Sequence, residues 1–276
     1  MLTGHTMLQS IASKVRKAYR TTVGAVDSIL GESDPLLPPG ALRDWVGHGD
    51  FKAIGEEFRG YFVELGGLKP DHRVLDVGCG VGRMAAPLTS YLKGGSYEGF
   101  DVAPAGIDWC RRNITTRYPN FRFQLVDNYN KAYNPGGTHK SSDYNFPYES
   151  DSFDFLFLAS VFTHMLLPDL ENYLSEIVRV LKRNARCLIT FHLLNAESWR
   201  LIEQKQLPYF QHELEGAYVH DTDTPETGVA YEEIFVRELY QRYGLRIVEP
   251  IHYGSWCERD EFLSYQDIVV ATKGGG

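Results

Sequence analysis

From Arg73 onward, short apolar runs alternate along the chain with amphipathic patterns of helical period. This alternation is typical of βαβ units that build a parallel sheet. A short link containing Gly254 and Ser255 separates the last two apolar runs, which predicts an antiparallel C-terminal hairpin. The predicted strands are residues 73–78, 96–101, 121–127, 153–160, 186–192, 245–253 and 264–272. We therefore expect an α/β fold with a mostly parallel sheet of seven strands and helices on both faces.

Amphipathic helices are predicted between these strands. Pro87 and Pro104 fall in first turns, where proline is tolerated. The clearest pattern follows Pro168 and repeats apolar residues at spacings of three and four. Gly244 provides a stop for the last helix. The predicted helices are residues 83–93, 104–114, 170–181 and 231–243.

Two apolar stripes precede the first strand and predict helices in an N-terminal extension over 1–69. We expect both helices to pack on the core or to cover the site as a lid, with residues 70–276 forming the main domain. The alternative for the first is a basic amphipathic helix that rests on a membrane or a partner. The stripes are Leu8, Ile11, Val15, Val23, Val26 and Leu30, beside Lys14, Arg16, Lys17 and Arg20, and then Phe51, Ile54, Phe58, Phe62 and Leu65.

Two segments of the main domain show no long apolar period. Residues 195–230 are rich in polar and turn-forming residues and are predicted to be an insertion of helix and loop. Residues 128–150 are predicted to form an irregular loop at the ligand-bearing edge of the sheet, because long ordered loops in compact domains often carry function. We expect both segments and the N-terminal helices to form a substrate pocket and its cover.

The first predicted strand runs into VLDVGCGVGRM, residues 74–84, with glycines at alternate positions. A dinucleotide-binding turn would place its third glycine at position 83, where this chain has Arg83. Asp76 precedes the turn, and its carboxylate would repel a pyrophosphate but attract a cation. Asp101 ends the second strand and can accept hydrogen bonds from both hydroxyls of a ribose. The turn therefore favours a positively charged adenosine cofactor, and an NAD-dependent oxidoreductase is the less favoured alternative.

Further motifs follow in order: VLDVGCGVGR is succeeded by EGFDV, LVDNY and FDFLFLASVFTHM. This set resembles the class I S-adenosylmethionine-dependent methyltransferases over residues 70–193 and 231–272. The resemblance implies a Rossmann-like fold, S-adenosylmethionine as the cofactor and methyl transfer to an acceptor. KRNAR at 182–186 departs from the lysine, proline and two glycines usual in the family. We expect this departure to affect stability rather than activity.

The resemblance also implies which residues contact the cofactor. They are Asp76 with Gly78, Cys79, Gly80 and Gly82 at the methionine part, Asp101 at the ribose, Val102 against the adenine, Asp127 and Asn128 near the adenine amino group, and the backbone of Ala159 and Ser160 beside the cofactor. A sulfonium makes its methyl group strongly electrophilic, so the protein must mainly align the acceptor and exclude water. A hydroxyl acceptor would also need a base nearby, and histidine suits that role.

Histidines and aromatic residues at the same edge are candidate acceptor contacts. His164 follows the fourth strand in SVFTHM and is the candidate general base; the alternative is that it caps a helix or packs beneath the loop. His192 ends the fifth strand and is either an acceptor contact or a packed, hydrogen-bonded histidine. Tyr253 and Trp256 belong to the predicted hairpin tip, where they either wall a pocket or pack. Arg83 either contacts a ligand or faces solvent.

Composition narrows the classes of function. The 276 residues carry a net charge of −8 and no large basic block, which disfavours a nucleic-acid partner. The cysteines form no CxxC pair and the start lacks a secretory signal, so we expect a cytoplasmic protein. No apolar run is long enough to span a membrane. No HExxH motif or tight cluster of histidines and acids predicts a metal site, although Asp127 and Asp154 leave magnesium-assisted transfer open.

We therefore expect an S-adenosylmethionine-dependent methyltransferase that acts on a small-molecule acceptor. Oxygen is the expected site of methylation, on a sugar, a lipid or a specialised metabolite, with nitrogen and carbon acceptors open. The alternative from a different class is a binding module that keeps the fold and the cofactor without catalysis.

Overall fold

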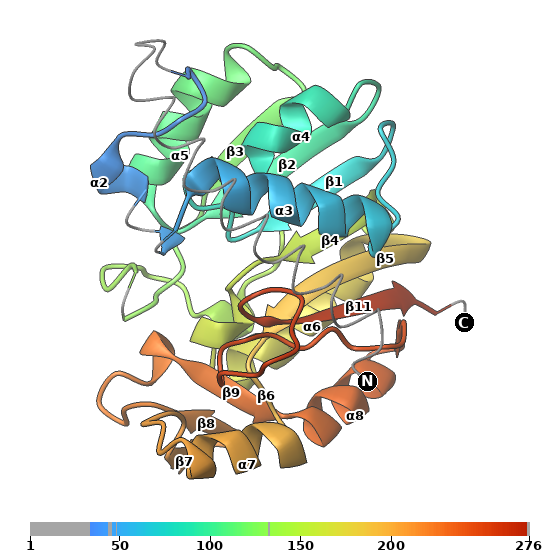
Figure 1. Cartoon of the computed structure of the whole chain (residues 1–276). Helices are drawn as coiled ribbons and strands as arrows, with labels where there is room; N and C mark the ends of the chain where they lie inside the picture. Colours follow the sequence, from blue (N-terminus) through green and yellow to red (C-terminus); the bar gives the residue numbers. More distant parts are fainter. Residues whose placement is uncertain (1–33, 44–45, 48, 132, 275–276) are drawn as a thin grey trace, which may run out of the picture.

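The computed structural model describes residues 34–43, 46–47, 49–131 and 133–274. Its centre is a seven-stranded sheet with the order β10-β11-β5-β4-β1-β2-β3 (Figure 1). Strands β1 to β5 run parallel, and β11 is antiparallel to both β5 and β10. The predicted fold class is confirmed. The strands are β1 (Arg73–Val77), β2 (Ser96–Asp101), β3 (Phe121–Leu125), β4 (Phe153–Leu158), β5 (Leu181–Phe191), β10 (Leu245–Ile247) and β11 (Asp267–Lys273).

The antiparallel pair of β10 and β11 is confirmed, but the predicted short link at Gly254 and Ser255 is wrong. Residues 248–266 separate the two strands. Pro250 lacks a backbone N–H and cannot continue the ladder, so regular pairing stops shortly before it. The chain then follows an irregular path, and Gly254 forms only an isolated bridge to Ser264.

Helices cover both faces of the sheet (Figure 1). On one face lie α3 (Phe51–Glu64), α4 (Ala85–Tyr91) and α5 (Pro104–Cys110), which continues as the π-helix η2 (Arg111–Thr115); on the other lie α6 (Leu167–Val180) and α8 (Glu233–Arg242). The short helices are α2 (Gly40–Arg43), η3 (Ser141–Asp143), η4 (Phe162–His164) and η5 (Pro225–Thr227). Within the described ranges, no helix is both long and apolar enough to cross a membrane.

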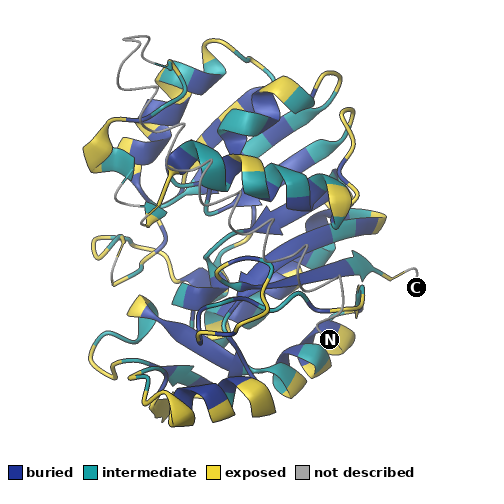
Figure 2. Cartoon of the chain, in the orientation of Figure 1, coloured by how far each residue is buried: buried dark blue, intermediate teal, exposed yellow. Residues whose placement is uncertain are grey.

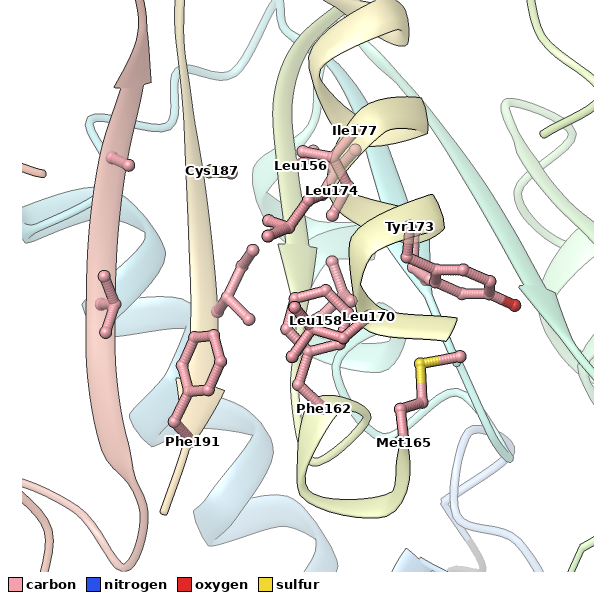
Figure 3. Packing of buried hydrophobic residues seen from close by; sticks show 14 of the residues in the cluster. Leu156, Leu158, Phe162, Met165, Leu170, Tyr173, Leu174, Ile177, Cys187 and Phe191 are labelled. Carbon is pink, nitrogen blue, oxygen red and sulfur yellow. The ribbon is translucent and has the colours of Figure 1, made fainter. Parts of the chain in front are cut away.

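Successive residues of β1 serve the two cores on either side of the sheet. Val74 belongs to the cluster that contains Phe62 of α3, and Leu75 to the cluster that contains Leu174 of α6. Figure 3 shows the second cluster, in which the apolar side chains of α6 point toward β4 and β5. The strands of the sheet are largely buried, whereas the outer sides of the helices are exposed (Figure 2).

Helix α3 confirms the second of the apolar stripes that precede β1. Its N-terminus is capped by Asp50, whose Oδ1 accepts a hydrogen bond from the Ala53 backbone N–H at 2.7 Å. Phe62 stacks on Phe157 of β4 with 4.1 Å between ring centroids, which fixes the helix against the sheet. The first stripe, from Leu8 to Leu30, lies outside the described residues, and the domain boundary at 69 and 70 stays a prediction.

The segment 195–230 contains strands that its sequence does not predict. It holds α7 (Ala196–Gln204), β7 (His212–Leu214), β8 (Ala217–Val219) and the start of β9 (Val229–Glu232). The three strands and β6 (Leu193–Leu194) form a second sheet of order β6-β9-β8-β7. The predicted start of a helix at Tyr231 is wrong, because Tyr231 lies in β9 and α8 begins at Glu233. Tyr231 is held there by a backbone hydrogen bond to the His192 carbonyl at 3.1 Å and by a hydroxyl bond to the Met165 carbonyl at 2.8 Å.

The unusual KRNAR segment follows α6 directly and forms part of β5. Asn184 has a φ of 63°, a left-handed conformation that asparagine tolerates better than most residues. Asparagine thus occupies a position of the kind that glycines usually fill.

Candidate cofactor and acceptor site

The glycine turn after β1 is held against the end of β2. The backbone N–H groups of Gly78 and Cys79 both donate to the Phe100 carbonyl, at 2.9 and 3.1 Å. Gly78 has a φ of 79°, and a Cβ there would lie 2.5 Å from Val161 Cγ2. Gly80 has a φ of 54°, and a Cβ there would lie 2.7 Å from a valine side chain. Only glycine fits these two positions without strain, so the backbone itself forms the wall that a ligand approaches.

Asp101 ends β2 beside this turn. Its Oδ2 accepts a hydrogen bond from the Gly80 N–H at 2.8 Å, and its Oδ1 accepts one from the Ala103 N–H at 2.9 Å. Burial raises the pKa of the Asp101 carboxyl, and these amide hydrogen bonds oppose that rise. A carboxylate offers about four acceptor positions. Both oxygens can therefore accept one more donor each, as the two hydroxyls of a ribose require.

A cavity of about 370 Å³ opens beyond the carboxyl ends of β1, β2 and β4. This is where open α/β sheets bind ligands. The predicted site residues that line it are Asp76, Gly78, Cys79, Gly80, Asp101, Val102, Ala159, Ser160 and His164. The predicted residues that are not part of its lining are Gly82, Asp127, Asn128, His192, Tyr253 and Trp256.

The two predicted adenine contacts after β3 differ in accessibility. Asp127 is exposed, and its Oδ2 accepts a hydrogen bond from the Thr138 hydroxyl at 2.5 Å. Asn128 is buried, and its Nδ2 donates to the hydroxyl of Tyr173, which lines the cavity. The Asn128 Oδ1 has no hydrogen-bond partner. An unsatisfied acceptor therefore lies close behind the cavity wall, and cofactor contact by either residue stays a prediction.

Asp76 brings a carboxyl group to the base of the cavity with only 1% of its surface exposed. The hydroxyl of Tyr97, on β2, donates a hydrogen bond to its Oδ2. Burial raises the pKa of Asp76 to about 8, and the hydrogen bond from Tyr97 acts in the opposite direction. No lysine, arginine or histidine in the described ranges shifts this pKa. A cationic ligand would supply the missing positive charge.

His164 ends η4, the short helix after β4, and its ring has a defined proton position. Its Nδ1 lies 2.8 Å from the Glu226 carbonyl oxygen, which can only accept, so Nδ1 carries the proton. The unprotonated Nε2 lies 3.5 Å from the hydroxyl of Tyr133, another residue of the cavity wall. Burial lowers the pKa of His164, so the ring is neutral at pH 7. A neutral imidazole with an unprotonated Nε2 beside the cavity is the state that a general base needs.

His192, Trp256 and Tyr253 have partners within the protein. His192 packs between Phe210 and Trp256, with ring centroids 5.2 and 5.3 Å away, and burial lowers its pKa to about 3. The Trp256 Nε1 donates to Asp267 at 2.7 Å. The Tyr253 hydroxyl donates to a Glu233 oxygen at 2.9 Å. All three side chains thus pack against or hydrogen-bond to other residues of the protein. Acceptor binding by any of them stays a prediction.

Tyr133 and Tyr173 could not be selected from the sequence as residues of the cavity wall, whereas Arg83 was a candidate. Tyr133 comes from the predicted edge loop, so the segment but not the residue was identifiable. Tyr173 belongs to the apolar stripe of α6, where helical spacing indicates only packing. Arg83 also lines the cavity, and its buried Nε has no hydrogen-bond partner. Burial lowers the pKa of Arg83 to about 10, which still leaves it charged at pH 7.

The two acids considered for a magnesium site have different hydrogen-bond partners within the protein. Asp154 accepts hydrogen bonds from the Arg73 N–H at 2.9 Å and from the Lys182 Nζ at 2.6 Å, whereas Asp127 binds Thr138. Among the residues that the structure describes, no three histidines, cysteines or acids are grouped so as to hold a metal ion. These residues give magnesium-assisted transfer no support.

Comparison with known proteins finds a match to a methyltransferase domain within this chain. Residues 75–189 match the model of a methyltransferase domain. A phthiotriol/phenolphthiotriol dimycocerosates methyltransferase from Mycobacterium leprae is 33% identical over 111 residues, which cover 40% of this chain and 34% of the relative. A sterol 24-C-methyltransferase from Schizosaccharomyces pombe is 31% identical over 122 residues, which cover 44% of this chain and 28% of the relative. The chain thus matches about a third of the length of these curated relatives.

The fold is also similar to that of a solved structure, a SAM-dependent methyltransferase from Methanosarcina mazei. The TM-score is 0.52 at 22% identity, over 76% of this chain and 95% of that chain. This likeness supports the fold, and the domain match supports the family and its cofactor, S-adenosylmethionine. Residues 75–189 therefore match a methyltransferase domain, and the chain has the fold of a SAM-dependent methyltransferase.

Proposed function

We propose that this protein transfers the methyl group of S-adenosylmethionine to a hydroxyl oxygen of a small, largely apolar acceptor such as a lipid. The observation that carries the proposal is the state of His164, whose Nδ1–H is held by the Glu226 carbonyl while the unprotonated Nε2 faces the Tyr133 hydroxyl on the cavity wall. Much of the cavity wall is apolar, with Val77, Phe100 and Met165 among its residues. One relative is named for a sterol, which supports an apolar acceptor.

The residues of the cavity fit the cofactor and leave a place for the acceptor. Asp101 has acceptor positions for ribose hydroxyls, Asp76 has no positively charged partner, and the turn from Gly78 to Gly80 allows close approach. The Tyr133 hydroxyl, 3.5 Å from Nε2 of His164, marks where a hydroxyl can face the base. We infer that the acceptor hydroxyl takes a similar place.

The protein needs to contribute little covalent chemistry to this reaction. When bound, S-adenosylmethionine supplies an electrophilic methyl group on a sulfonium. Nε2 of His164 would accept the hydroxyl proton as the acceptor oxygen takes the methyl group, while Asp76 and Asp101 would hold the cofactor that supplies this group. The backbone carbonyl of Glu226 holds the His164 ring in the required tautomer, so the protein mainly positions the acceptor against Nε2.

The test replaces the base and follows both the chemistry and the binding. For His164→Gln, we expect kcat to fall by about 100-fold or more, the usual scale for general base catalysis. The Kd for S-adenosylmethionine should change less than about twofold, because His164 is not among the groups placed at the cofactor. Release of S-adenosylhomocysteine is measured with a panel of sterols and hydroxylated lipids, and mass spectrometry locates the added methyl group.

His139→Gln is the matched control, because His139 is an exposed histidine of the edge loop. Unchanged turnover in His164→Gln would contradict the base. A product methylated on carbon or nitrogen would contradict the hydroxyl acceptor. Cofactor binding with no S-adenosylhomocysteine released by any acceptor would favour the non-catalytic binding module.

A further inference from the structure

Asp76 and Tyr97 form a buried pair at the base of the cavity. Asp76 lies on β1 opposite Gly99, and Tyr97 lies two residues before Gly99 on β2, so both side chains are on the face covered by α3, α4 and α5. The Tyr97 ring is 0% exposed and stacks on Phe121 with 5.0 Å between centroids. Because packing fixes the ring, its hydroxyl is held where it donates to Asp76 Oδ2.

The other titratable groups around Asp76 bring no compensating positive charge. Asp101 at the end of β2 is an acid, and burial raises the pKa of the Cys79 and Cys110 thiols, so both thiols are neutral. Arg83 lines the same cavity but forms no ion pair with Asp76. A buried carboxylate without a positive partner is costly, and protonation is the way to avoid that cost.

We propose that the Asp76–Tyr97 pair holds a proton in the cofactor-free protein and releases it to the solvent when the positively charged S-adenosylmethionine binds. The O–H bond of the Asp76 carboxylic acid breaks, the proton passes to the buffer, and the carboxylate stays as the counter-charge of the cofactor. Tyr97 is the positioning residue, since its hydroxyl donates to the carboxylate that forms. This inference rests on the proposed function, because it requires the cofactor in this cavity.

The linkage has a definite sign. Burial raises the pKa of Asp76 to about 8 in the cofactor-free protein, and a nearby cation lowers it. Affinity for S-adenosylmethionine therefore rises with pH below about pH 8, by close to tenfold per pH unit where one proton is released, and levels off above it. An uncharged ligand gains nothing from ionising Asp76, so its affinity does not follow pH in this way.

Calorimetry of the full chain measures the proton directly. S-adenosylmethionine is titrated at pH 7 in phosphate and in Tris, whose ionisation enthalpies differ, and the difference in heat gives the number of protons released. We expect a value close to one. Methylthioadenosine lacks both the sulfonium and the amino-acid part of the cofactor, and we expect it to release none.

Two substitutions separate the roles of the pair. Asp76→Asn should abolish the proton release and the pH dependence, weaken S-adenosylmethionine binding at pH 8 by tenfold or more, and leave methylthioadenosine binding within twofold. Tyr97→Phe removes the hydrogen bond that favours the charged carboxyl, so the pH midpoint should move upward. Tyr118→Phe is the matched control, because the Tyr118 ring also contacts Phe121, and we expect an unchanged midpoint. Circular dichroism verifies that each variant is folded.

The outcomes distinguish this inference from the function on which it rests. If the wild-type protein binds no S-adenosylmethionine, the proposed function fails. If it binds without releasing a proton, or if Asp76→Asn still releases one, the function stands and the proton-holding pair is wrong. If the pH midpoint of Tyr97→Phe equals that of the wild type, Tyr97 does not act as the positioning residue.

Discussion

Around β1 and β2 the cavity wall is built from neighbouring backbone, whereas beyond β4 it is built from side chains that are distant in sequence. The glycine turn and Asp101 are joined by amide hydrogen bonds within a stretch of about 25 residues, from Gly78 to Ala103. On the other side, His164 contacts Tyr133, 31 residues away, and Glu226, 62 residues away. Within the proposed site, the cofactor side, at the glycine turn and Asp101, is therefore determined locally, whereas the acceptor side, at His164, depends on a contact with the insertion.

The largest expected effect concerns Asp267, which joins segments that meet only in the folded chain. Its buried carboxylate accepts hydrogen bonds from the Leu193 and Gly254 N–H groups and the Trp256 Nε1, each at 2.7 Å, and from Arg259 at 3.0 Å. Asp267→Ala leaves these donors unpaired and Arg259 without its buried partner. We expect a loss of about 3–5 kcal/mol in the free energy of unfolding, measured with urea.

Asp260→Ala controls for the removal of an acid near the same loop, because Asp260 is exposed. It should change the free energy of unfolding by no more than about 0.5 kcal/mol. A loss below about 1 kcal/mol for Asp267→Ala would mean that this carboxylate does not hold together the segments that donate hydrogen bonds to it.

On the cofactor side, Asp101→Ala should act on binding. We expect the affinity for S-adenosylmethionine to fall by roughly 1.5–3 kcal/mol, the scale for losing hydrogen bonds to a charged group. Methylthioadenosine also carries the ribose, so its affinity should fall by a similar amount, unlike in Asp76→Asn. Calorimetric titration measures both ligands, and Asp108→Ala, on the exposed side of α5, is the control. Unchanged affinity would count against the ribose contact.

The smallest effect concerns His192, whose burial makes the free energy of unfolding depend on pH. Burial lowers the pKa of His192 to about 3 from its ordinary value of 6.5, so the unfolded chain binds the proton more readily. The neutral ring therefore stabilises the fold fully above pH 6.5, and this contribution is lost as the pH falls from 6.5 toward 3. Between pH 7 and pH 5 the loss amounts to about 2 kcal/mol.

His192→Asn tests this dependence, because an amide can still donate to the Val229 carbonyl without titrating. Urea unfolding at pH 7 and pH 5 should show a loss that is smaller in the variant than in the wild type by about 2 kcal/mol. Equal losses would show that His192 does not set the acid sensitivity.

The same contrast explains which parts of the fold the sequence could predict. β1 and β4 were recognisable because each is a mainly apolar segment between polar or turn-forming neighbours. β7 and β8 have three residues each, too few to show an alternation, and the link 248–266 gives no sign of its length. Tyr231 fits a helical spacing equally well, and only its pairing beside β6 places it in a strand.

The candidate site divides in the same way. Asp76 and Asp101 could be placed because each belongs to a strand whose carboxyl end was identifiable. Tyr97 could not be paired with Asp76, since the strand register that brings them together is a property of the sheet and not of either strand. Glu226 contributes a backbone carbonyl to His164, and any residue type has such a group.

That carbonyl has a consequence for the exchange of parts between related enzymes. Glu226 lies in η5 and within the insertion, yet it decides which nitrogen of His164 carries the proton. A chimera that receives a foreign insertion of different length would lose the acceptor for Nδ1–H. In the proposed function, grafting such a segment therefore requires that the donor segment restore an oxygen at the same point.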